Sequence, residues 1–130
     1  MTNDDDPADG PPTLPSTARP VQKPSGLEYF EFAAGRGAPV RPGMRVRVSY
    51  RAWLTDGTLF DTTAKQGGAV EFVLGDGEIL PALDEGVAGM CVGAKRRLIV
   101  PSDLAYGPRG RGAVPPFATL IYDVELLQAD

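Results

Sequence analysis

Few side chains in this 130-residue sequence could carry out nucleophilic, acid–base or metal-assisted chemistry. Histidine is absent from the sequence, which excludes Ser-His-Asp triads, Cys-His pairs and imidazole metal sites. The single cysteine, Cys91, is flanked by Met90 and Val92 and is interpreted as a small apolar filler rather than a reactive thiol. We therefore expect no metal and no cofactor.

Phe60, Asp61 and Tyr106 are the candidate site residues with the most suggestive local setting. Phe60-Asp61 comes shortly after the strong turn signal Asp56-Gly57, and Tyr106 stands in a Gly/Pro-rich loop over residues 101–116. Long loops in compact domains are often functional. From the residues alone, Asp61 is better interpreted as a carboxylate that caps a turn.

The elements that must position these residues are mostly strands. Residues 45–54 alternate strictly, with apolar side chains on one face and Arg45, Arg47, Ser49, Arg51 and Trp53 on the other, which predicts a half-buried strand. Further strands are predicted over residues 27–32, 70–74, 95–100 and 117–128. Tyr50, Phe72 and Tyr122 lie on inward strand faces, so residue pattern alone makes them core aromatics.

One helix is predicted, over residues 80–90. Leu80, Leu83, Val87 and Met90 recur at helical spacing, and Pro81 suits the first turn because its missing N–H is not needed there. The expected fold class is α+β, with a curved antiparallel β-sheet wrapped around one short α-helix.

Residues 1–25 differ in composition from the rest of the chain. They are acidic and rich in proline and hold few large apolar groups, which predicts a disordered tail before a single domain over residues 26–130. No stretch is long and apolar enough to span a membrane, and the start resembles no secretory signal, so we expect a cytoplasmic protein. The net charge of −4 argues against a nucleic-acid partner.

The ordered motifs of the domain resemble those of FKBP-type peptidyl-prolyl isomerases. The likeness covers residues 26–128 and includes Asp56-Gly57 with Phe60-Asp61 after Tyr50, the run Phe72-Val73-Leu74-Gly75, and the run Val114-Pro115-Pro116-Phe117. The resemblance implies an apolar cleft between the helix and the concave face of the sheet. It implies a site made of Phe60, Asp61 and Tyr106 as catalytic residues and Tyr50, Phe72, Ile79, Leu80, Leu83, Val114 and Tyr122 as substrate-binding residues.

Within that cleft, the resemblance implies that the backbone N–H of Ile79 and the hydroxyl of Tyr106 bind the substrate's carbonyls. Two features depart from the family pattern. Leu83 stands where many members carry a tryptophan, and the loop from Tyr106 to Pro115 is one residue shorter. The smaller Leu83 predicts that macrolides such as rapamycin bind, but weakly.

The predicted activity is isomerisation of X-Pro peptide bonds in polypeptide substrates, in support of protein folding. Twisting the bond reduces its charge separation, so a dry aromatic pocket favours the twisted amide without a nucleophile or metal. The alternative is a peptide-binding or chaperone module of the same fold with weak catalysis. A hydrolytic enzyme is excluded because no nucleophile–base pair exists, and we expect a monomer.

Overall fold

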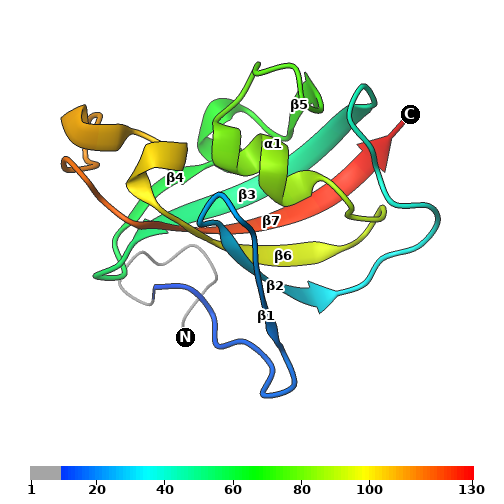
Figure 1. Cartoon of the computed structure of the whole chain (residues 1–130), viewed down its shortest axis with the longest axis horizontal. Coiled ribbons are helices and arrows are strands. Elements are labelled where there is room, and N and C mark those ends of the chain that lie inside the picture. The colour runs from blue at the N-terminus through cyan, green and yellow to red at the C-terminus, as the bar shows by residue number, and fades with distance from the viewer. Residues whose placement is uncertain (1–9) are drawn as a thin grey trace.

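The computed structural model describes residues 10–130, which form a curved antiparallel sheet with one helix against its concave face (Figure 1). The seven-stranded sheet runs in the order β1-β2-β6-β7-β3-β4, and β5 also pairs with β3. The strands are β1 (Pro20–Gln22), β2 (Glu28–Ala33), β3 (Arg45–Leu54), β4 (Leu59–Thr62), β5 (Val70–Val73), β6 (Lys95–Val100) and β7 (Leu120–Ala129). The helical segments are α1 (Pro81–Val87) and the 3-10 turns η2 (Ala64–Gln66), η3 (Ser102–Leu104) and η4 (Gly107–Arg109). The α+β expectation is confirmed.

Strands β3 and β7 are the long central pair of the sheet. They are antiparallel from the pair Val46↔Ala129 to the pair Leu54↔Leu120, with a bulge between Arg47 and Val48. The bounds of β3 match the predicted strand. One residue on its outer face departs from the prediction: Trp53 is only 1% exposed, and the guanidinium carbon of Arg51 lies 5.2 Å from its ring centroid.

Helix α1 is shorter than the predicted span because the backbone leaves helical geometry at Ala88, where ψ is 130°. Pro81 occupies the first turn as expected. The buried face of the helix packs on β6, and Gly86 makes that approach possible, since a Cβ there would lie 2.5 Å from Cδ1 of Leu98. The helix therefore sits close enough to the sheet to form one wall of a cleft.

Arg96 ties the end of α1 to the sheet. Its Nη1 donates to the carbonyl oxygens of Gly86 (3.1 Å) and Ala88 (2.9 Å), and its Nε donates to Glu31 (2.9 Å). The guanidinium carbon also lies 4.2 Å from the ring centroid of Tyr29. These bonds satisfy carbonyls that a helix end leaves without partners, so a charged residue is stably buried here.

The predicted disordered tail needs correction for residues 20–22. They form β1, which pairs antiparallel with β2 through Pro20↔Phe30, Val21↔Tyr29 and Gln22↔Glu28. The prediction rested on composition, which indicates how much apolar surface the side chains can bury. Strand β1 is instead held by backbone hydrogen bonds at the edge of the sheet, and side-chain hydrophobicity does not predict those bonds. The part of the prediction that falls on residues 1–9 lies outside the described residues.

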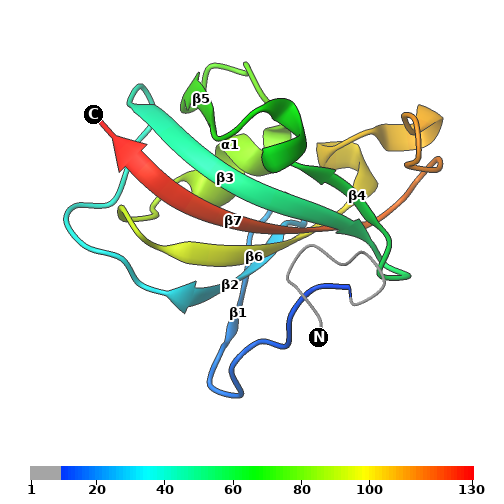
Figure 2. The same ribbon diagram turned by 180° about the vertical axis from the view of Figure 1, so that it is seen from behind.

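Residues 12–14 line a cavity over the face opposite α1, the face turned toward the viewer in Figure 2.

Among residues 10–130, no helix is long and apolar enough to cross a membrane.

Candidate functional site

A cleft of about 680 Å³ lies between the start of α1, strands β3 and β4, and the loop that follows β6. Eight of the ten predicted site residues line it, brought together from four separate stretches of chain. Those eight are Tyr50, Phe60, Asp61, Ile79, Leu80, Leu83, Tyr106 and Val114.

Phe72 and Tyr122 need correction as predicted walls, because neither lines the cleft. Phe72 is 2% exposed and Tyr122 is 1% exposed, and both belong to the hydrophobic core. They stand on inward strand faces that neighbouring elements cover completely. Their effect on the cleft is therefore indirect, through the residues that they support.

Tyr122 supports the aromatic side of the cleft from beneath. Its ring centroid lies 5.3 Å from that of Tyr50, with the planes tilted by 54°. It lies 6.3 Å from that of Phe60, and those planes meet edge to face at 86°. Tilted and edge-to-face contacts are the favourable arrangements of aromatic pairs. The buried ring of Tyr122 therefore positions two side chains of the cleft wall, Tyr50 and Phe60.

Polar groups lie beside these aromatic rings. The Tyr50 hydroxyl donates to Oδ2 of Asp61 at 3.4 Å, a long hydrogen bond. Burial, with the neighbouring groups of Tyr106, Tyr50 and Asp61, raises the pKa of the Tyr122 phenol well above its ordinary value of 10.0. The phenol therefore stays neutral, and the carboxyl of Asp61 lies beside the aromatic walls of the cleft.

Ile79 lines the cleft and carries a backbone donor that no protein group in residues 10–130 uses. The carbonyl of the next residue, Leu80, accepts from the N–H groups of Leu83 and Asp84 at 2.9 and 3.1 Å, so the start of α1 is fixed beside Ile79. A half-buried N–H without a partner is uncommon and suits an incoming carbonyl.

The long loop after β6 is more ordered than the sequence indicates. It contains η3 and η4, and Arg111 and Val114 exchange backbone hydrogen bonds of 2.9 and 2.8 Å. Gly110 has a φ of +65° and lies so close to the carbonyl of Val114 that no side chain fits there. This tight closure presents Tyr106 and Val114 on the same wall of the cleft.

Sequence reasoning missed several lining residues, two of them charged. Glu78 precedes the predicted Ile79, and Arg111 lies in the loop that is one residue shorter than in the family pattern. The other missed lining residues are Gly77, Pro81, Gly112 and Ala113. Only the adjacency of Glu78 to Ile79 gave a signal in the sequence. The two opposite charges give the cleft a polar side.

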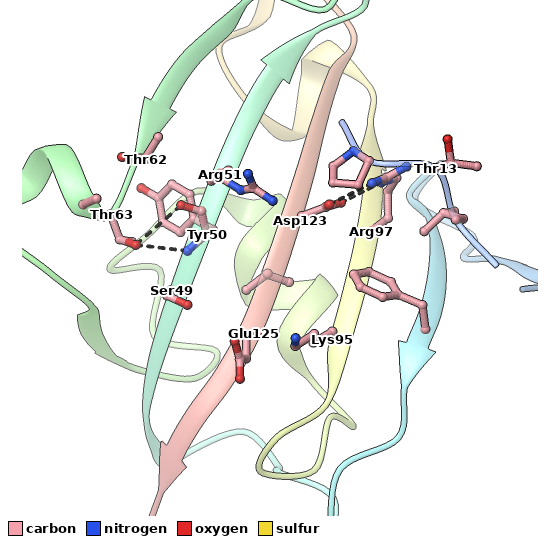
Figure 3. A pocket seen from close by; sticks show the side chains of 15 residues that line it. Thr13, Ser49, Tyr50, Arg51, Thr62, Thr63, Lys95, Arg97, Asp123 and Glu125 are labelled. Carbon is pink, nitrogen blue, oxygen red and sulfur yellow. Dashed lines mark hydrogen bonds and ion pairs between the residues drawn. The ribbon is translucent and has the colours of Figure 1, made fainter. Parts of the chain in front are cut away.

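A second cavity, of about 440 Å³, lies on the opposite face of the sheet beneath residues 12–14 (Figure 3). Its most prominent polar groups bond to one another: Arg97 donates to both carboxylate oxygens of Asp123 at 2.6 and 2.7 Å. Tyr50 is the one predicted site residue on its lining. The first cleft is therefore the candidate site. No cluster of three potential metal-ligating side chains occurs in the described part of the chain.

Comparison with known proteins gives a consistent match. A family model described as FKBP-type peptidyl-prolyl cis-trans isomerase matches residues 37–127. The chain is similar to FK506-binding protein 2 of Yarrowia lipolytica, with 47% identity over 91 residues, 69% of this chain and 63% of that protein. It is also similar to the peptidyl-prolyl cis-trans isomerase FPR2 of Saccharomyces cerevisiae, with 50% identity over 88 residues, 66% of this chain and 65% of that protein.

The fold has a close structural counterpart in the N-terminal domain of FKBP42 from Arabidopsis thaliana. The TM-score is 0.80 at 31% identity, and the alignment covers 92% of this chain and 97% of that one. The two curated relatives named above are covered over less than two thirds of their own length.

Proposed function

Because the chain belongs to the FKBP-type peptidyl-prolyl cis-trans isomerase family, we propose that it accelerates rotation about X-Pro peptide bonds and thereby assists protein folding. The observation that carries the proposal is the composition of the cleft. It combines aromatic and aliphatic walls with an unbonded backbone N–H at Ile79 and a hydroxyl at Tyr106. The substrates would be proline-containing polypeptides.

The reaction needs no bond to be broken. Rotation is opposed by ~18–20 kcal/mol because twisting removes the resonance of the C–N bond. The twisted amide is less polar than the planar one, so transfer from water to an apolar cleft favours the twisted form. Each tenfold in rate needs about 1.4 kcal/mol of preferential binding to that form.

Each group in the cleft has a distinct role in this mechanism. Tyr50, Phe60 and Leu83 would enclose the proline ring and exclude water from the amide. The Ile79 N–H and the Tyr106 hydroxyl would bind the carbonyls on the two sides of the ring and hold one part of the chain while the other rotates. Asp61 would stand at the edge of the cleft. As the bond twists, the lone pair becomes localised on the amide nitrogen, and the carboxylate of Asp61 would affect that change in polarity.

The direct test is a protease-coupled isomerisation assay on a short Xaa-Pro peptide. The wild-type chain should shorten the slow phase in proportion to its concentration, and Asp61→Val should reduce that effect while the protein stays folded. A slow phase unchanged by micromolar wild-type protein would overturn the proposal.

A second candidate, a peptide-holding module with weak catalysis, rests on Leu83. This side chain is 1% exposed and lines the cleft, where it fills less volume than an indole would. A looser base encloses the proline less completely and reduces the preference for the twisted amide. Suppressed aggregation of an unfolding protein, together with negligible isomerisation, would favour this candidate.

Ligand selectivity follows from the same residue. We expect rapamycin-type macrolides to bind, and Leu83→Trp to tighten that binding by filling the base of the cleft. Calorimetry on both proteins would check this; equal or weaker affinity in a folded Leu83→Trp variant would contradict it. Monomeric state and cytoplasmic location stay predictions, to be checked by size-exclusion chromatography and cell fractionation.

A further inference from the structure

The carboxylate of Asp84 bonds the backbone of the loop that leads into α1. Oδ1 accepts from the N–H of Gly75 and Oδ2 accepts from the N–H of Gly77, both at 3.0 Å. One side chain thus uses both oxygens on two donors of the same loop. Hydrogen bonds to an ionised acceptor are stronger than neutral ones.

Two longer hydrogen bonds also hold the loop: the N–H of Asp76 donates to the carbonyl of Val73 at 3.2 Å, and the N–H of Val73 donates to Oε1 of Glu78 at 3.4 Å. Residues 75–78 are exposed, so no burial holds this stretch in place. Gly75 and Gly77 have φ values of +87° and +75°, a conformation that favours glycine and gives the loop no side chain at those points. The loop nonetheless carries Gly77, Glu78, Ile79 and Leu80 to the lining of the cleft.

Helix α1 itself is well anchored. Leu83, next to Asp84, is buried against the sheet, and Arg96 holds the far end of the helix through the carbonyls of Gly86 and Ala88. Asp84 therefore links a fixed element to a loop whose residues 75–78 are exposed. Ile79, two residues after Gly77, lines the cleft, and its N–H has no acceptor within residues 10–130.

We propose that Asp84 is a positioning residue of the isomerase site: by holding Gly75 and Gly77, it sets the place of the Ile79 N–H that receives the substrate's carbonyl. The inference rests on the proposed function for its substrate. Asp84 does not line the cleft and so acts only through the loop. Loss of the carboxylate should loosen the loop and weaken substrate binding, with little effect on the rotation step.

The test compares Asp84→Ala and Asp84→Asn with matched changes at Asp76. Asp76 is an exposed carboxylate of the same loop, whose side chain bonds no group in residues 10–130. We expect Asp84→Ala to raise KM roughly five- to tenfold with kcat nearly unchanged, because uniform binding is what is lost. Asp84→Asn, which keeps one amide oxygen as acceptor, should show a smaller rise, and Asp76→Ala and Asp76→Asn should behave as wild type.

Amide hydrogen exchange supplies a readout that does not depend on turnover. Gly75 and Gly77 should lose protection in Asp84→Ala while the amides of β3 and β7 keep theirs. Unchanged KM in a folded Asp84→Ala variant would overturn the inference, and so would a fall in kcat at constant KM. An inactive wild-type protein would refute the proposed function instead; weaker binding of a proline peptide to Asp84→Ala than to Asp76→Ala would then still support the role of Asp84.

Discussion

Phe60 and Phe72 offer a sharp comparison, because the same residue type occupies a cleft wall in one case and the closed core in the other. Phe60 is half-buried, lines the cleft and meets Tyr122 edge to face. Phe72 is 2% exposed and lines no part of the cleft. Replacing each by leucine makes one chemical change in two environments.

The structure predicts opposite balances of stability and activity. Phe72→Leu should lower the free energy of unfolding by about 1–2 kcal/mol, because a closed core cannot refill the lost volume. Phe60→Leu should cost about 1 kcal/mol or less, since its main loss is one edge-to-face contact in a partly open setting. Conversely, kcat/KM should fall roughly three- to tenfold in Phe60→Leu and ten-fold or more in Phe60→Ala, at ~1.4 kcal/mol for each factor of ten.

Urea unfolding and the protease-coupled assay, run on the same preparations, separate the two quantities. Activity is divided by the folded fraction before variants are compared. Equal normalised activity in Phe60→Leu and Phe72→Leu would refute the assignment of Phe60 to the substrate wall. Loss of normalised activity in Phe72→Leu but not in Phe60→Leu would mean that the substrate does not bind against Phe60.

Three further predictions concern stability. Because folding raises the pKa of Tyr122, the contribution of this residue to stability is complete below the pKa of the unfolded chain, 10.0, and is lost as pH rises above that value. The free energy of unfolding of Tyr122→Phe should therefore depend less on pH than that of the wild type between about pH 9 and 11, as measured by urea unfolding. Arg96→Met should destabilise the fold by about 3 kcal/mol in chemical unfolding, because it leaves the carbonyls at the end of α1 and Glu31 without their partner; a loss under ~1 kcal/mol would contradict that role. A chain starting at residue 23 should be less stable than one starting at residue 10 by about 1–3 kcal/mol, because it lacks β1 and the segment over the Arg97–Asp123 pair; equal midpoints in urea would show that the segment adds nothing.

Local pattern was sufficient for most of the sheet. Strict alternation predicted β3 with its observed bounds. The strand predicted over residues 95–100, which ends at Pro101, also has the bounds of β6. Alternation is a property of neighbouring residues, because successive side chains point to opposite faces whatever the strand pairs with. The helix was predicted in place but too long, since its end depends on the backbone turn at Ala88 rather than on the spacing of Leu83 and Val87.

The sequence by itself determined that this chain carries no histidine chemistry, that it forms an α+β domain, and which aromatic residues are candidates for a site. Tertiary structure alone decided which of those aromatics meet a substrate. Tyr50 and Tyr122 have the same pattern on inward strand faces, yet one lines the cleft and the other lies beneath it, because the covering loop and helix come from distant parts of the chain. Likewise, Asp84 resembles an ordinary acidic residue of a helix until folding brings its carboxylate against Gly75 and Gly77. Such contacts depend on the relative placement of whole elements, which no local spacing of residues encodes.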